Sequence, residues 1–193
     1  MRFVINPGHE QIRDKGAPGA AGVPEATINR EVARALCALS DATITYEAKR
    51  QGVVGLWMLT RALRANSPDA LVSLHCNAAK HHPPCIHEGQ VYYWASDPDS
   101  ERRACSLGLA SAIREHAEGL MSERVTIRTA PYNRDGKLFL PGILDGTAKR
   151  AAVLVEMGFI SDRHVAEAMN TAGWVARTAS ALDNGIRQWM RGL

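Results

Sequence analysis

The chain has 193 residues, of which 46% are hydrophobic and 22% are charged, ordinary values for a soluble globular protein of one domain. The formal net charge is only +3, and no dense Lys/Arg run with interleaved aromatic residues occurs, so the composition argues against nucleic-acid binding. No apolar stretch of about 18 residues is present that would form a membrane helix. We therefore expect one domain, residues 1–193, that does not insert into a membrane.

The first residues, MRFVINPGHE, place a single arginine before the short apolar run Phe3–Ile5. This run is too short for the apolar region of a signal peptide, so we expect a cytoplasmic protein without an export signal or anchor. The four cysteines form no CxxC pair, which suits a reducing compartment.

Hydrophobic periodicity predicts strands and helices that alternate along the chain. In chain order, the predicted elements are a strand over 2–6, a helix over 25–39, a strand over 42–47, a helix over 55–66, strands over 69–76 and 89–95, a helix over 100–117, strands over 124–129, 137–144 and 151–159, and a helix over 175–189. Such alternation is typical of an α/β domain. We expect a mostly parallel central sheet with helices on both faces.

Three of the predicted strands end at a residue that can bind a metal ion or transfer a proton. RFVINPGH leads to His9, DALVSLH ends at His75, and AAVLVE ends at Glu156. In open α/β sheets the functional crevice lies beyond the carboxyl ends of the strands, so parallel strands would bring these three residues together.

A second glutamate, Glu25, is expected to join them from the start of the first helix. It follows Pro24, a residue suited to the first turn of a helix, and it lies three positions before the apolar Ile28. Glu25 is therefore on the core-facing side of that helix, and the long loop over 8–24 allows it to return to His9.

Two imidazoles and one carboxylate, with a fourth position open to water, form a known catalytic zinc site. Zinc lowers the pKa of coordinated water to about 7, and a neighbouring glutamate accepts the proton and passes it to a leaving amine. We expect His9, Glu25 and His75 to bind Zn²⁺ and Glu156 to act as the general base. The residue types alone leave open that the histidines are surface or core residues and that Glu25 only complements the helix dipole.

Five segments resemble, in the same order, the zinc-dependent N-acetylmuramoyl-L-alanine amidases, the type shared by bacterial cell-separation amidases and many phage endolysins. They are INPGHE, GAPGAAGVPEATIN, TRALRAN, SLHCNAA and AVLVEMGFISD. The resemblance implies the same metal ligands and the same catalytic Glu156. This family usually has aspartate where Asn6 stands and often glycine where Glu10 stands. Because asparagine brings no charge, we expect weaker support of the His9 imidazole.

The resemblance implies hydrolysis of the amide between the lactyl group of N-acetylmuramic acid and the first L-alanine of the stem peptide in peptidoglycan. Small size and the absence of an export signal favour a phage or prophage endolysin over a housekeeping amidase. Such a monomeric enzyme would reach the cell wall after a separate holin-like factor releases it. Residues 119–150 match the family poorly, and we expect them to influence substrate specificity.

Three alternatives stay open at this point. A non-catalytic peptidoglycan-binding domain with an amidase fold is one, although all four functional residues are present. The segment HVAE, His164 to Glu167, fits the HxxE pair of some zinc carboxypeptidases and so allows a zinc peptidase that acts on stem peptides. The third alternative is a structural zinc site in the loop over 76–87, whose spacing matches no common zinc finger or ribbon. Its candidate ligands are Cys76, His81, His82, Cys85 and His87.

Overall fold

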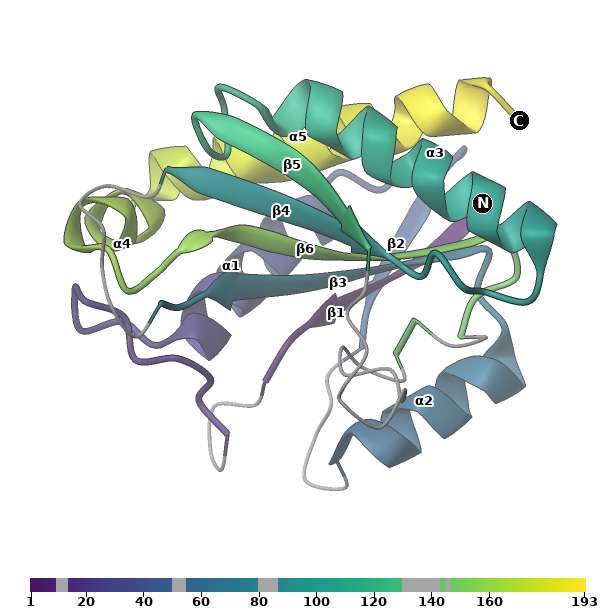
Figure 1. The fold of residues 1–193 in the computed structure, drawn as a ribbon, viewed down its shortest axis with the longest axis horizontal. Helices are drawn as coiled ribbons and strands as arrows, with labels where there is room; N and C mark the ends of the chain where they lie inside the picture. Colours follow the sequence, from purple (N-terminus) through teal and green to yellow (C-terminus); the bar gives the residue numbers. More distant parts are fainter. Residues whose placement is uncertain (10–13, 50–54, 80–86, 130–142, 145–146) are drawn as a thin grey trace.

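The computed structural model describes residues 1–9, 14–49, 55–79, 87–129, 143–144 and 147–193, and their helices and strands alternate as expected (Figure 1). In chain order they are β1 (Arg2–Pro7), α1 (Glu25–Cys37), β2 (Thr45–Ala48), α2 (Gly55–Asn66), β3 (Ala70–Asn77), β4 (Glu88–Tyr93), α3 (Ser100–Ala117), β5 (Arg124–Thr129), β6 (Ala151–Phe159), α4 (Arg163–Met169) and α5 (Ala172–Arg191). The prediction of a single α/β domain is confirmed.

All of these strands join one sheet in the order β2-β1-β3-β6-β4-β5. β2, β1, β3 and β6 run parallel, β4 pairs antiparallel with β6, and β5 runs parallel to β4. The prediction of a mostly parallel sheet is therefore confirmed. Because β4 is reversed, its first residues lie at the edge of the sheet where β1, β3 and β6 end.

Helices cover both faces of the sheet, as expected (Figure 1). α1, α3 and α5 pack on one face around the larger apolar cluster, and α2 packs on the other through Leu59 and Leu63. The central strands β3 and β6 are thus buried on both faces, which explains why Ala151–Val155 is apolar without interruption. No helix in the described part of the chain is long and apolar enough to span a membrane.

The predicted boundaries fail mainly around residues 38–44. α1 ends at Cys37, so Leu39 lies outside the helix, and β2 begins at Thr45 rather than at residue 42. The Asp41 carboxylate accepts hydrogen bonds from the backbone amides of Thr43 and Ile44 at 2.8 and 3.0 Å, which makes a turn where a strand was expected.

Most of the strand predicted over 137–144 lies outside the described residues. Only Ile143 and Leu144 of that segment are described, and both are buried in a turn rather than a strand.

Candidate metal centre

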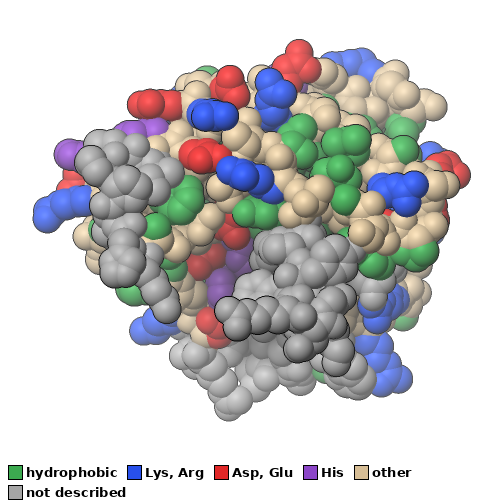
Figure 2. Space-filling model, viewed as in Figure 1, with side chains coloured by type: hydrophobic (Ala, Val, Ile, Leu, Met, Phe, Trp, Pro, Cys, Tyr) green, Lys and Arg blue, Asp and Glu red, His purple; other side chains and the backbone are tan. Residues whose placement is uncertain are grey.

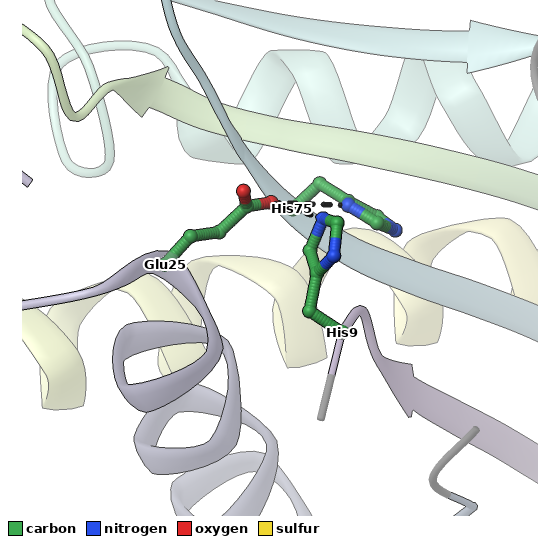
Figure 3. A group of neighbouring side chains, drawn as sticks. All are labelled: His9, Glu25 and His75. Carbon is green, nitrogen blue, oxygen red and sulfur yellow. Dashed lines mark hydrogen bonds and ion pairs between the residues drawn. The ribbon is translucent and has the colours of Figure 1, made fainter. Parts of the chain in front are cut away.

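His9, Glu25 and His75 converge at the carboxyl ends of β1 and β3, beside the first turn of α1 (Figure 3). Each offers a ligand atom, and these atoms all lie within 4.8 Å of one another. Within the described ranges this is the only group of three or more His, Cys, Asp or Glu residues whose ligand atoms lie this close together. The convergence expected from the strand ends is therefore present.

Glu25 lies at the centre of this group. Its Oε1 lies 3.1 Å from His75 Nδ1 and 3.3 Å from His9 Nε2, and its Oε2 accepts a 2.9 Å hydrogen bond from the Ala17 amide. Burial opposes the negative charge, but hydrogen bonds from both histidines and from the Ala17 and Cys76 amides outweigh it and hold the pKa of Glu25 well below its usual range. The carboxylate is therefore ionised, as a metal ligand must be.

The backbone of His9 has φ +65°, in the left-handed region that non-glycine residues rarely adopt. Its Nδ1 lies 2.8 Å from Asp14 Oδ2, while its Nε2 faces Glu25. Hydrogen bonding to Glu25, aided by Asp14 and opposed by burial, raises the pKa of His9 to about 9. Asp14 thus occupies one ring nitrogen and leaves the other for a metal ion, an arrangement common among metal-binding histidines.

The expectation of weaker support for His9 is wrong, because the carboxylate comes from Asp14. Asn6 faces elsewhere: its Oδ1 accepts from Ser73 Oγ at 2.9 Å and its Nδ2 donates to the Lys49 carbonyl at 2.8 Å. Glu10, the other departure from the family pattern, lies outside the described residues.

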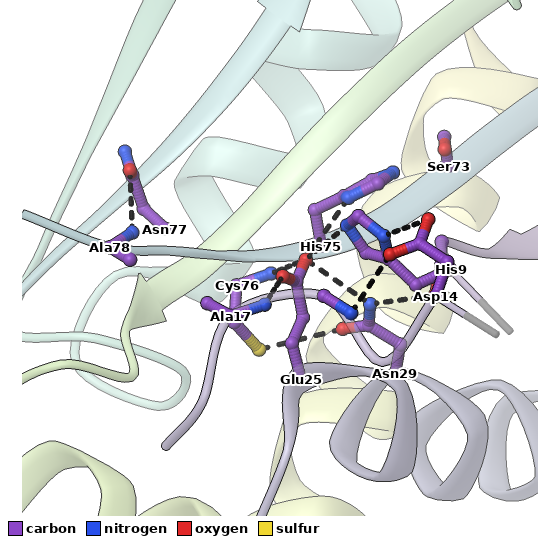
Figure 4. Close-up of polar contacts among 12 residues, drawn as sticks. His9, Asp14, Ala17, Glu25, Asn29, Ser73, His75, Cys76, Asn77 and Ala78 are labelled. Atoms are coloured by element: carbon purple, nitrogen blue, oxygen red, sulfur yellow. Dashed lines mark hydrogen bonds and ion pairs between the residues drawn. The ribbon is translucent and has the colours of Figure 1, made fainter. Parts of the chain in front are cut away.

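A second residue that sequence reasoning missed is Asn29, one turn after Glu25 in α1 (Figure 4). It is fully buried, donates through Nδ2 to the Gly8 carbonyl at 3.1 Å, and accepts from Cys76 Sγ at 3.4 Å. Asn29 therefore ties the helix that carries Glu25 to β1 and β3. An uncharged amide on an otherwise apolar helix face was the only available signal.

Two glycines make room for the site. A Cβ at Gly8 would lie 2.1 Å from His75 Cε1, and a Cβ at Gly16 would lie 2.5 Å from Glu25 Oε2. Gly16 also has φ +66°, a conformation that favours glycine. The Gly-rich loop is thus packed tightly against the candidate ligands.

Glu156 lies beside this group on β6, as the Cα partner of His75 on β3. Side chains of paired residues share a face of the sheet, so Glu156 and His75 project to the same side. Glu156 Oε2 is buried and has no hydrogen-bond partner among the described residues. Burial, together with the negative charge of Glu25 and against the opposing effect of His9, raises the pKa of Glu156 to about 8. A buried carboxylate oxygen without a hydrogen-bond partner is costly, which marks this position as a site candidate.

The surface is hollowed on this face of the molecule, and acidic and histidine side chains are visible inside the hollow (Figure 2). Two imidazole nitrogens and one carboxylate oxygen suit Zn²⁺ with an open fourth position. The residues present therefore fit the expected metal.

The two other zinc sites considered gain no support from the described residues. His164 and Glu167 are exposed on α4, and Glu167 Oε1 instead pairs with Arg163 Nε at 2.9 Å. Of the loop ligands, Cys76 points towards Asn29, whereas His87 Nδ1 lies 3.6 Å from Glu123 Oε1. The remaining candidates in that loop lie outside the described residues, namely His81, His82 and Cys85.

Comparison with known proteins identifies a family that matches nearly the whole chain. A family model described as N-acetylmuramoyl-L-alanine amidase (Amidase_3) matches residues 3–188. No curated protein sequence matches the chain.

Among solved structures, the amidase AmiC2 of Nostoc punctiforme is similar at a TM-score of 0.79 and 21% identity, over 99% of this chain and 97% of that one. The amidase Ami1 of Mycobacterium smegmatis is similar at 0.75 and 18%, over 100% and 98%. The catalytic domain of the CD27L endolysin, which targets Clostridia difficile, is similar at 0.69 and 16%, over 97% of each chain. At these identities the structures support the fold.

Proposed function

Because the chain belongs to the N-acetylmuramoyl-L-alanine amidase family, we propose that residues 1–193 form a zinc-dependent catalytic domain acting on peptidoglycan. It hydrolyses the amide between N-acetylmuramic acid and the L-alanine of the stem peptide. The observation that carries this proposal is the convergence of three metal-capable side chains beside Glu156, whose buried Oε2 has no hydrogen-bond partner among the described residues.

His9, Glu25 and His75 would hold Zn²⁺, which when bound supplies a Lewis acid for activating water and polarising the amide carbonyl. Glu156 Oε2 accepts a proton from the attacking water, since none of the described residues hydrogen-bonds this oxygen. The protonated Glu156 then delivers the proton to the nitrogen of the departing alanine. A base with a raised pKa suits both halves of this exchange near neutral pH.

The test is digestion of purified peptidoglycan by the wild-type protein and by Glu156→Gln. We expect the wild type to release stem peptides with a free N-terminal alanine, identified by mass and by amine labelling. Glu156→Gln keeps its size but cannot accept the proton, so its rate should fall roughly 100- to 10,000-fold. Its zinc content should stay at the wild-type level, as measured by elemental analysis.

Other outcomes would redirect this proposal. Wall binding without any product would favour a non-catalytic peptidoglycan-binding domain, and cuts inside the stem peptide would favour a zinc peptidase. Loss of the metal from Glu156→Gln would make Glu156 a ligand instead of the base.

We further propose the narrower role of a lysin released to the wall by a separate holin-like factor. The fold shared with the CD27L endolysin catalytic domain supports it. In an expressing bacterial host, turbidity should fall rapidly only after the inner membrane is permeabilised. Lysis without permeabilisation would favour a housekeeping amidase that is exported.

A further inference from the structure

A row of polar side chains continues from the metal centre across the sheet. In the strand pairing, Glu156 on β6 has His75 on one side and Gln90 of β4 on the other. All three side chains share one face, because paired residues in a sheet project to the same side. Gln90 is only 8% exposed, so the amide beside Glu156 is largely removed from water.

Gln90 is held by partners other than Glu156. Its Oε1 accepts a hydrogen bond of 2.6 Å from the Tyr92 hydroxyl and one of 3.2 Å from Asn77 Nδ2. Gln90 also hydrogen-bonds the carboxyl group of Glu88, two residues earlier on the same face of β4. The amide is thus bonded along its own strand and to the end of β3, rather than across to β6.

This arrangement matters because Glu156 is within reach of Gln90. Side chains directly opposite one another in an antiparallel pair have Cβ atoms about 4.5–5.5 Å apart. A glutamine amide at that separation can donate to a carboxylate, yet no residue in the described part of the chain hydrogen-bonds Glu156 Oε2. A donated hydrogen bond would stabilise the charged carboxylate and occupy the oxygen that must accept a proton.

We propose that Tyr92 and Asn77 are positioning residues that hold the Gln90 amide away from Glu156 and so leave the Glu156 carboxylate free to accept a proton. The Tyr92 ring packs against the apolar cluster on the α2 face, which fixes the direction of its hydroxyl. The inference rests on the proposed function, since it assumes that Glu156 is the base.

The decisive variant is Tyr92→Phe, which removes one oxygen and keeps the ring. With its carbonyl partly released, the Gln90 amide can turn from Glu88 and donate to Glu156 instead. We expect kcat on purified peptidoglycan fragments to fall about tenfold with KM unchanged, because the rate change arises at the base.

The matched control repeats the same change in a Gln90→Met background. Methionine cannot donate to Glu156, so Tyr92→Phe should cause no further loss there. An equal loss in both backgrounds would overturn the inference, because the Tyr92 hydroxyl would then act independently of the Gln90 amide. Asn77→Ala provides a second variant, expected to show the same fall in kcat to a smaller extent, because its hydrogen bond to Gln90 is longer.

A crystal structure of Tyr92→Phe tests the inference without any assay of activity. We expect Gln90 Nε2 within about 3.2 Å of Glu156 Oε2. Gln90 unmoved, or a wild-type rate in Tyr92→Phe, would refute the positioning role while the amidase assignment stands. An inactive wild type would refute the proposed function, and the place of Gln90 in the variant would still decide whether Tyr92 holds it.

Discussion

Gly8 packs directly against the imidazole of His75, which leaves no room for a side chain at this position. Gly8→Ala would push a methyl group into the ring, so His75 must move from its present place. We expect zinc affinity to fall roughly 10- to 100-fold, the range typical of changes that disturb the support of a metal ligand. Competition with a chromogenic chelator measures the zinc affinity of the variant and of the wild type.

Gly173→Ala in α5 is the matched control, since the nearest atom to its added methyl group is the flexible Arg177 Nη1 at 3.4 Å. Its zinc affinity should equal that of the wild type. An unchanged affinity in Gly8→Ala would show that His75 is not held by this contact, or is not a ligand.

The raised pKa of Glu156 predicts a pH-dependent cost to stability in the metal-free protein. Folding favours the neutral form of the Glu156 carboxyl. This group therefore contributes its full stabilisation below the ordinary pKa of 4.5, and the stabilisation is lost as the pH rises through about 8. Glu156→Gln removes this loss. With a chelator present, we expect the variant to exceed the wild type at pH 8 by roughly 1–4 kcal/mol in free energy of unfolding.

At pH 5 the two proteins should unfold at nearly the same urea concentration, because the folded carboxyl is then neutral in the wild type as well. A wild type more stable than Glu156→Gln at pH 8 would contradict the burial argument. It would indicate that a partner satisfies the carboxylate in solution.

At the scale of the elements, α5 is joined to the first half of the chain by a charged network. Asp183 accepts a 2.6 Å hydrogen bond from the Tyr46 hydroxyl of β2 and pairs with Arg187 Nε at 2.8 Å. Arg187 also pairs with Asp41 at 2.7 Å, in the turn that delays β2. Asp183→Asn weakens the interactions of this buried side chain with both Tyr46 and Arg187. We therefore expect a loss of about 1–3 kcal/mol in free energy of unfolding.

The chain offers a matched control in the exposed pair of Arg163 and Glu167 on α4, which has the same spacing of four residues. Glu167→Gln should change stability by less than about 0.5 kcal/mol. Urea unfolding of both variants gives the comparison. Equal losses would show that the Asp183 network is as weakly coupled as a surface pair.

Sequence periodicity was sufficient for elements with long, regular patterns, and α3, β5 and β6 begin and end where predicted. It failed where one side chain redirects the backbone, as Asp41 does before β2. The reversed direction of β4 was not predicted, because alternation of apolar and polar residues is the same for a strand read in either direction.

The candidate ligands were accessible to sequence reasoning because strand and helix ends indicate where chain segments meet. Their supporting residues were not. Asp14 reaches His9 and Gln90 lies beside Glu156 only after the loop and the strand pairing have formed. Neither contact leaves a spacing pattern along the chain.

At the scale of the whole molecule, a bound ion would connect β1, α1 and β3. Binding to the folded state alone stabilises it by about 4 kcal/mol at a free concentration 1,000 times the dissociation constant. We expect added Zn²⁺ to raise the thermal midpoint of the metal-free protein and His75→Ala to abolish the increase. Differential scanning fluorimetry measures the thermal midpoint with and without added Zn²⁺.

His164→Ala removes an exposed histidine on α4 and should keep the full increase. A zinc response that survives in His75→Ala but disappears in a Cys76/Cys85 double variant would instead place the ion in the loop over 76–87.

The order of the sheet also bears on synthesis at the ribosome. The neighbours β2, β1 and β3, with all three candidate ligands, belong to the first 77 residues, whereas β6 is made last of the strands and must enter between β3 and β4. At translation rates of about 5–20 residues per second, Glu156 follows His75 by several seconds. If the proposed function holds, the nascent chain therefore carries the three candidate metal ligands before it carries the candidate base, and the site is complete only when the last strand closes the sheet.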